Sequence, residues 1–228
     1  MRELRITPLH NWNVTGREAT EIQRELQKML SIEERPLKPC VIAGVDVSFP
    51  RPDTGLAVVV LLGFASMEMI DYYYATLEIT TPYIPGLLSF REGPVILKAL
   101  EKVKDADLLF FDGHGIAHPR GIGIASHIGL FLDRPTIGVA KRLLYGETAT
   151  PGPERGESTP ILSKNGNTIG FSLRTRAGKN PVFVSPGTGL SVEQALAMTI
   201  KTTGEFKLPE PTRKAHIMTQ KLKNQLCL

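Results

Sequence analysis

Residues 40–49 read CVIAGVDVSF, and residues 108–115 read LLFFDGHG. Both runs are apolar enough for buried strands, yet each holds one aspartate, Asp46 in the first run and Asp112 in the second. A lone carboxylate is costly to remove from water, so two of them in such settings need a shared partner. A divalent metal is the most economical partner, because hard cations bind carboxylate oxygens. The two runs therefore indicate chemistry on phosphate.

The apolar periodicity along the chain predicts the elements that surround these runs. A capping box at 15–18 opens a helix over 15–30, and Thr212 is the predicted cap of the last helix. The segment 146–166 is rich in Gly, Pro, Glu, Ser and Asn and is predicted to be a surface loop. Strands are predicted at 40–48, 56–64, 68–79, 107–112, 136–140, 167–175 and 181–185, and the other helices at 94–104, 120–132, 191–202 and 212–225.

This order of elements indicates the fold class. The first three strands have short connections and should form an antiparallel meander, whereas the two strands that follow helices should run parallel in the same sheet. Three antiparallel strands followed by helix, strand, helix and strand is the ribonuclease H-like order. We therefore expect an α/β protein with a ribonuclease H-like fold, in which helices flank a mixed central sheet. With no long linker, the chain is expected to form a single domain over 1–228.

The charge and the cysteine content of the chain indicate its cellular environment and its binding partners. The net charge is +4, and from residue 201 onward six basic residues stand against two acidic ones. This basic end is suited to a polyanion, although a solvated helix face explains it equally well. Cys40 and Cys227 form neither a disulfide framework nor a metal-ligand spacing, which favours a reducing compartment. The N-terminus lacks an apolar signal core, and the longest apolar stretch, 56–65, is too short to cross a bilayer. We expect a cytoplasmic protein that does not contact a membrane.

The two aspartates are predicted to form a metal site. Their strands are neighbours in this topology, so Asp46 and Asp112 should meet on one side of the sheet and bind Mg²⁺ or Mn²⁺. Glu92 stands just before the predicted start of the helix at 94 and can supply a third oxygen. A metal held in this way polarises a phosphate oxygen and lowers the pKa of a bound water, as phosphodiester hydrolysis requires.

Two basic side chains are candidates for the same site. Lys141 follows the apolar strand 136–140, and open α/β sheets place ligand contacts at the carboxyl ends of their strands. His216 lies one turn after Thr212 on the last helix, beside its apolar stripe. For both residues a plain surface role is equally compatible with the sequence alone.

The segment TPYIPG at 81–86 is unusual, because two prolines stiffen a short loop that presents Tyr83 and Ile84. A rigid apolar wedge of this kind can enter a base stack and hold the gap left by an extruded nucleotide. A loop that packs the same two side chains into the core is the alternative.

Seven segments, in order over nearly the whole chain, resemble the motifs of the endonuclease V family of deoxyinosine-specific DNA repair nucleases. They are GVDVSF at 44–49, PYIPGLLSFREGP at 82–94, DGHGIAHPR at 112–120, IASHIGL at 124–130, PTIGVAK at 135–141, VSPG at 184–187 and EPTRKAH at 210–216. The resemblance implies a ribonuclease H-like fold, recognition of deaminated purine in DNA, and Mg²⁺ as cofactor with Mn²⁺ as substitute. It also implies a nick at the second phosphodiester bond 3′ to the lesion, which leaves 3′-hydroxyl and 5′-phosphate ends and does not excise the base.

The resemblance also implies roles for the candidate catalytic residues. By motif, Asp46 and Asp112 match the metal ligands, and Glu92 matches a further ligand or a carboxylate that positions water. His216 matches the family histidine tied to a second metal or to the attacking water. Lys141 matches the lysine near the scissile phosphate.

Further residues match the parts of the family that recognise DNA. Tyr83, with Pro82, Ile84 and Pro85, matches the strand-separating wedge, and His118 matches a residue that helps to position the nucleic-acid backbone. His114 departs from the family pattern, since members commonly carry an amide there. The pocket for the flipped base matches segments that contain Leu88, Gly113, Gly115 and Ile124.

Two other functions remain open alongside a DNA-specific nuclease that acts as a monomer. Sugar-kinase and actin-like phosphotransferases share the fold and a Gly-x-Asp strand, but they need two such lobes around ATP, and this chain holds one. A metal-bound nucleic-acid-binding module without catalysis is the second, although the full carboxylate set with His216 argues against it. Deoxyinosine in DNA is the expected substrate, with other deaminated bases and inosine in RNA left open.

Overall fold

A mixed sheet of eight strands forms the centre of the protein, whose computed structural model describes residues 4–226. The strands are β1 (Val41–Arg51), β2 (Thr54–Gly63), β3 (Met69–Glu78), β4 (Leu108–Asp112), β5 (Thr136–Ala140), β6 (Ser158–Leu162), β7 (Thr168–Leu173) and β8 (Val182–Thr188). The described residues also form the helices α1 (Gly16–Gln27), α2 (Leu88–Leu100), α3 (Ile124–Leu132), α4 (Val192–Lys201) and α5 (Glu210–Leu226).

The strands follow the order β3-β2-β1-β4-β5-β8-β7-β6 across the sheet. β1, β2 and β3 form the antiparallel meander, and β4 and β5 run parallel to β1. β8, β7 and β6 extend the sheet with antiparallel pairing. The predicted meander and the two parallel strands are confirmed, and the fold is an α/β ribonuclease H-like fold.

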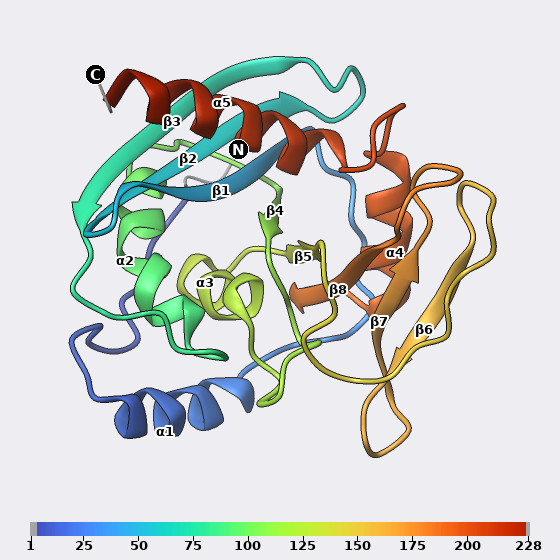
Figure 1. The fold of residues 1–228 in the computed structure, drawn as a ribbon, viewed down its shortest axis with the longest axis horizontal. Coiled ribbons are helices and arrows are strands. Elements are labelled where there is room, and N and C mark those ends of the chain that lie inside the picture. The colour runs from blue at the N-terminus through green and yellow to red at the C-terminus, as the bar shows by residue number, and fades with distance from the viewer. Residues whose placement is uncertain (1–3, 227–228) are drawn as a thin grey trace.

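Helices cover both faces of this sheet, and α5 runs across β1 and β2 (Figure 1). α2 and α3 pack on one face, which receives Ala43 and Val45 of β1. α4 and α5 pack on the other face, which receives Ile42. Because successive side chains of a strand point to opposite faces, Asp46 points to the same side as Ile42. The fold thus directs this carboxylate towards α5.

The start of α2 differs from the prediction. The helix begins at Leu88 rather than at 94, so Pro94 lies inside it and Glu92 belongs to the helix, not to the segment before it. The prediction was wrong because a proline was taken as a helix start. Packing decides otherwise: a Cβ atom at Gly93 would lie 2.6 Å from the ring of Trp12, so the turn before Pro94 is fixed against an aromatic side chain.

Three other boundaries were also wrong. α3 begins after the predicted residue 120, because Gly121 has a φ of 67° that does not continue a helix. Thr212 does not cap α5 but lies within it, where its hydroxyl donates to the Pro209 carbonyl at 3.1 Å. The loop predicted at 146–166 contains β6, which pairs with β7 and so adds an edge strand to the sheet.

The cysteine and membrane predictions are tested only in part. Cys40 is exposed and free, whereas Cys227 lies outside the described residues, as do residues 1–3 of the N-terminus. Within residues 4–226, no helix has the length and apolar character needed to span a bilayer.

Candidate active site

Asp46 and Asp112 lie side by side on the face of the sheet that α5 covers. β1 and β4 pair in parallel with Gly44 opposite Phe110, so two residues further along the carboxylates come level and point the same way. Asp46 is only 6% exposed, whereas Asp112 is partly exposed at the end of β4. One ligand atom from each of Asp46, Asp112 and His216 lies within 4.8 Å of the others. The two aspartates meet as predicted, and their role as metal ligands stays a prediction.

His216 reaches this pair because α5 packs very close to β1. A Cβ atom at Gly44 would lie 2.0 Å from the carbonyl oxygen of Pro211, so only glycine allows the approach. The Nδ1 atom of His216 then stands 3.3 Å from Oδ2 of Asp46. A residue 170 positions away in the sequence therefore completes the cluster.

Negative charge accumulates in the cluster. Burial raises the pKa of Asp46, the charge of Asp112 raises it further, and His216 and Lys141 act in the opposite direction. Burial likewise raises the pKa of Glu92 to about 8, with a further contribution from the charges of Asp46 and Asp112. The Nζ atom of Lys141 lies 2.5 Å from Oδ2 of Asp112. The charge of the carboxyl groups is thus opposed by Lys141 and His216 at Asp46 and by Arg91 at Glu92.

This donor set fits a hard divalent cation. Carboxylate oxygens are the ligands that Mg²⁺ and Mn²⁺ prefer, and here two of them converge in a mostly buried place. A cation between Asp46 and Asp112 would turn the repulsion that raises the pKa of Asp46 into attraction. Glu92 is not among the three residues whose ligand atoms converge, but its pKa responds to both aspartates.

A cavity of about 310 Å³ opens beside Asp112. Gly113, which directly follows Asp112, forms part of its wall, together with Leu88 from the start of α2 and Ile124 from the start of α3. These three residues were predicted to line a base pocket, and they do line one cavity. The complete lining consists of Tyr83, Gly86, Leu88, Ser89, Gly113, His114, His118, Gly123, Ile124, Arg142, Leu143 and Leu144.

Gly115 is not among the residues that line this cavity, and its predicted place in a base pocket stays a prediction. A Cβ atom at Gly115 would lie 2.0 Å from the carbonyl oxygen of Pro186, and its N–H donates to the Ser185 hydroxyl at 2.9 Å. This glycine therefore allows the loop after β4 to pack on β8.

The predicted wedge, residues 82–85, lies on the surface beside the cavity. All four residues are exposed, and Tyr83, which is 67% exposed, also contributes to the cavity wall. The alternative of a loop that buries Tyr83 and Ile84 in the core is therefore wrong. Whether these side chains enter a base stack stays a prediction.

His118 is 3% exposed and lies in the wall of the cavity. Its Nδ1 accepts from the backbone N–H of Arg120 at 3.2 Å, so its Nε2 carries the proton and donates to the carbonyl of Gly86 at 3.1 Å. Burial, followed by the charge of Arg120, lowers the pKa of His118 to about 4. The imidazole is therefore neutral at physiological pH. Both ring nitrogens are engaged within the protein. The predicted contact of His118 with the nucleic-acid backbone stays a prediction.

Comparison with known proteins decides the family. A family model described as Endonuclease V matches residues 24–217. The chain belongs to the endonuclease V family. The endonuclease V of Kosmotoga olearia is 49% identical to it over 225 residues, which cover 98% of this chain and 99% of that protein. Membership in this family makes the chain a nuclease, a hydrolase of the nucleic-acid backbone.

Solved structures of endonuclease V proteins share its fold. The crystal structure of endonuclease V from Streptomyces avermitilis has 35% sequence identity and a TM-score of 0.89, and covers 99% of this chain and 100% of that one. The Ciona intestinalis endonuclease V, in complex with a 24mer DNA containing an inosine followed by a ribo-adenosine, has 23% identity and a TM-score of 0.80. That alignment covers 92% of this chain and 98% of the Ciona chain.

Seven residues of the cavity wall were not among the site residues predicted from the sequence of this endonuclease V family member: Gly86, Ser89, Gly123, His114, Arg142, Leu143 and Leu144. Arg142, Leu143 and Leu144 directly follow Lys141. Lys141 was selected because it follows a buried strand, and the same criterion could have selected these three residues. His114 was noted only as a departure from the family pattern. Burial lowers the pKa of His114 to about 4, which keeps its imidazole neutral inside the cavity.

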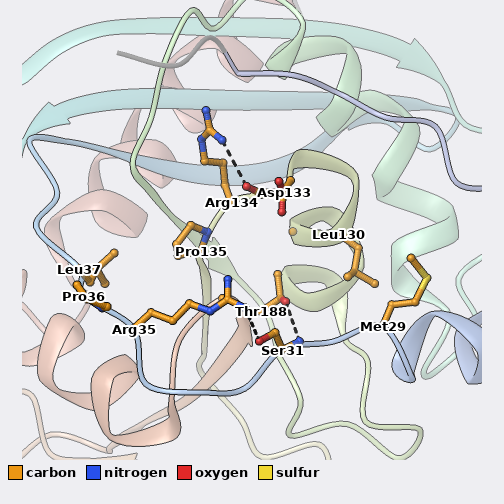
Figure 2. A pocket seen from close by; sticks show the side chains of 12 residues that line it. Met29, Ser31, Arg35, Pro36, Leu37, Leu130, Asp133, Arg134, Pro135 and Thr188 are labelled. Carbon is orange, nitrogen blue, oxygen red and sulfur yellow. Dashed lines mark hydrogen bonds between the residues drawn. The ribbon is translucent and has the colours of Figure 1, made fainter.

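A second cavity of about 310 Å³ lies at the opposite end of β5 (Figure 2). Pro135, just before β5, is part of its wall, whereas the carboxylate cluster lies beyond the other end of the strand. In Figure 2 the guanidinium of Arg35 donates to the hydroxyl of Ser31, whose N–H donates to Thr188. None of the residues predicted from the sequence as site residues lines this cavity. In this endonuclease V family member, Leu88, Gly113 and Ile124 line the cavity beside Asp112 instead.

Proposed function

We propose that this member of the endonuclease V family recognises deoxyinosine, the product of adenine deamination, in DNA and nicks the strand that contains it. The cut falls at the second phosphodiester bond 3′ to the lesion and leaves 3′-hydroxyl and 5′-phosphate ends. The observation that carries the proposal is the base-sized cavity directly beside the cluster of Asp46, Asp112 and His216. A base held in this cavity fixes which phosphodiester bond lies over the cluster.

The cofactor in this proposal is Mg²⁺, with Mn²⁺ as a substitute. Asp46, Asp112 and His216 would hold it, with Glu92 as a further ligand or as the carboxylate that positions water. Such a cation, when bound, polarises a phosphate oxygen and lowers the pKa of a bound water. In the metal-free protein, burial and the charges of Asp46 and Asp112 raise the pKa of Glu92 to about 8. A cation held by the two aspartates would lower this pKa, and the ionised Glu92 could then accept a proton from the attacking water.

Lys141 has a separate task in the proposed reaction. Its ammonium lies 2.5 Å from Asp112, so it stands at the edge of the cluster that a scissile phosphate would approach. A fixed positive charge at this point stabilises the negative charge that develops on the phosphate oxygens. The Lys141 side chain is 44% exposed and is therefore accessible to DNA.

The cavity supplies the proposed lesion specificity. Hypoxanthine offers a carbonyl acceptor and a ring N–H donor, whereas adenine offers an amino group in place of the carbonyl. The neutral imidazole of His114 stands in the wall, and its buried Nδ1 has no hydrogen-bond partner within the described residues, so it can pair with the base. The N–H of Gly113 already donates to the carbonyl of Val139 at 3.3 Å. The exposed Tyr83 and Ile84 would fill the space that the extruded nucleotide leaves in the duplex.

The DNA complex of the Ciona protein supports DNA with inosine as the substrate class for this family member. Other deaminated bases, and inosine in RNA, are further substrates to be tested. We also propose that the protein acts as a monomer in the cytoplasm and that residues 1–228 form a single domain.

A nicking assay tests the proposed function. Duplex DNA and matched RNA strands that carry one inosine are incubated with the protein, with and without Mg²⁺, and the cut is mapped on a sequencing gel. We expect one Mg²⁺-dependent cut at the second bond 3′ to the inosine, and none with Asp46→Ala or Asp112→Ala, which should still bind DNA. Unchanged nicking by both variants, or a cut at another bond, would contradict the proposal.

A DNA-binding measurement and an ATP hydrolysis measurement separate the two alternatives. Binding of inosine-containing DNA in Mg²⁺ with no product over hours would favour a binding module without catalysis. Hydrolysis of ATP that does not depend on nucleic acid would favour a phosphotransferase.

A further inference from the structure

The carbonyl oxygen of Gly86, directly after the wedge at 82–85, receives three hydrogen bonds from side chains. Nε2 of Gln23 donates at 3.0 Å, Nη2 of Arg120 at 2.5 Å and Nε2 of His118 at 3.1 Å. A carbonyl oxygen has two lone pairs, so three donors saturate it. This convergence makes Gly86 a fixed point at one end of the wedge.

Gln23 is the centre of this arrangement, although it lies on α1, far from the wedge in the sequence. Its side chain is fully buried, and its Oε1 accepts from Nε of Arg120 at 2.5 Å. Its Nε2 also faces the carbonyl of Ile122 at 3.5 Å, besides Gly86. Each atom of the amide thus has a partner of the matching kind, which fixes the side chain in one orientation. A buried polar group is costly unless it is paired in this way.

The conformation of Gly86 matches the clamp. Its φ of 79° lies in the left-handed region, and a Cβ atom would stand 2.7 Å from Nη2 of Arg120. The turn can therefore form only at a glycine, and the guanidinium occupies the space that a side chain would need.

The other end of the wedge is held in the same way. Nη1 of Arg91 donates to the carbonyl of Thr81 at 2.5 Å, and its guanidinium carbon lies 4.5 Å from the ring centroid of Phe49. The carbonyls on both sides of residues 82–85 are thus bound by arginines, while the four residues between them are exposed. Such an arrangement holds the base of the loop and leaves its tip free for a partner.

We propose that Gln23, together with Arg120, is a positioning residue that holds the wedge at a fixed place relative to the cavity through the carbonyl of Gly86. The inference rests on the proposed function, in which Tyr83 and Ile84 fill the gap left by a flipped base. Opening a base pair costs a few kcal/mol, so the wedge matters when the inosine lies in a duplex. In an unpaired strand no pair has to be opened, and the position of the wedge matters less.

The substitution Gln23→Leu tests this role, because leucine has a similar volume and makes none of the amide hydrogen bonds. We expect kcat/KM for inosine in a duplex to fall on the order of tenfold or more. For the same strand without its complement we expect a change of less than about twofold. Gln27→Leu, one turn further along α1 at an exposed position, is the matched control and should nick both substrates like the wild type. Equal loss on both substrates, or unchanged duplex nicking, would overturn the inference.

Hydrogen exchange gives a second readout that does not depend on activity. The N–H of Leu87 donates to the carbonyl of Ile84 at 2.9 Å and so closes the wedge turn. Gln23→Leu should speed exchange at this amide about tenfold or more, while amides at 95–100 of α2 stay unchanged. Unchanged exchange at Leu87 would overturn the clamp. Faster exchange together with a wild type that does not nick would support the clamp and overturn the proposed function alone.

Discussion

Replacing Glu92 by glutamine is expected to stabilise the metal-free protein at neutral pH. The pKa of Glu92 is raised from 4.5 to about 8, first because the group is buried and then because Asp46 and Asp112 are negatively charged. A carboxyl group with a raised pKa binds its proton more tightly in the folded state than in the unfolded chain. The free energy of unfolding therefore falls as the pH rises from about 4.5 towards 8, and glutamine, which does not ionise, removes this loss.

The magnitude follows from the same two pKa values. At pH 7 the solution lies about 2.5 units above the unperturbed value of 4.5, and 1.36 kcal/mol per unit gives about 3 kcal/mol. Glu92 keeps some accessible surface, so about 3 kcal/mol is an upper limit and about 1–3 kcal/mol is expected. For a chain of this length the corresponding rise in Tm is roughly 2–12 °C.

Thermal unfolding followed by circular dichroism in chelator tests the expectation. The difference in Tm between Glu92→Gln and the wild type should be present at pH 7 and should vanish near pH 4.5. Excess Mg²⁺ should reverse the order, because the wild type gains binding energy that the variant loses in part. Glu101→Gln, at an exposed position where α2 ends, is the control and should change little. A Tm for Glu92→Gln at or below that of the wild type at pH 7 without metal would refute the reasoning.

Three further substitutions test other parts of the site. Asp112→Asn should lower the nicking rate at least about a thousandfold with DNA binding retained, because a metal site lowers the activation free energy by several kcal/mol. Single-turnover rates and a DNA-binding assay check this. Gly44→Ala should cost about 3 kcal/mol, or roughly 6–12 °C in Tm, since the Pro211 backbone must shift, and a normal Tm would contradict the packing argument. Leu88→Trp should fill the cavity and abolish inosine-directed nicking, and an unchanged preference for inosine would exclude this cavity as the base pocket.

Much of the architecture could be predicted because the decisive signals are local. The capping box of Thr15 and Glu18 is present as predicted, and the short connections of the meander leave one way to pair the first three strands. Once β1 and β4 are neighbours, alternation along each strand places Asp46 and Asp112 on one face. The core of the candidate cluster therefore follows from periodicity and topology.

The features that escaped prediction depend on contacts between distant segments. The turn before Pro94 is helical because Gly93 packs on Trp12, and no local rule contains that contact. The close packing of Gly115 against Pro186 of β8 likewise depends on a contact between distant segments. The hydrogen bond from Gln23 to Gly86 joins residues 63 positions apart, and the sequence of an amphipathic helix does not indicate which group its buried glutamine will bind.

The residues of the cluster are synthesised at different times. His216 is 170 residues downstream of Asp46, and ribosomes add about 5–20 residues per second, so a growing chain carries Asp46 for roughly 10–30 seconds before α5 can be made. Until then the face of β1 around Gly44 lacks its cover, and the carboxylates lack their histidine. The complete cluster of two carboxylates and a histidine therefore arises only after synthesis has passed residue 216.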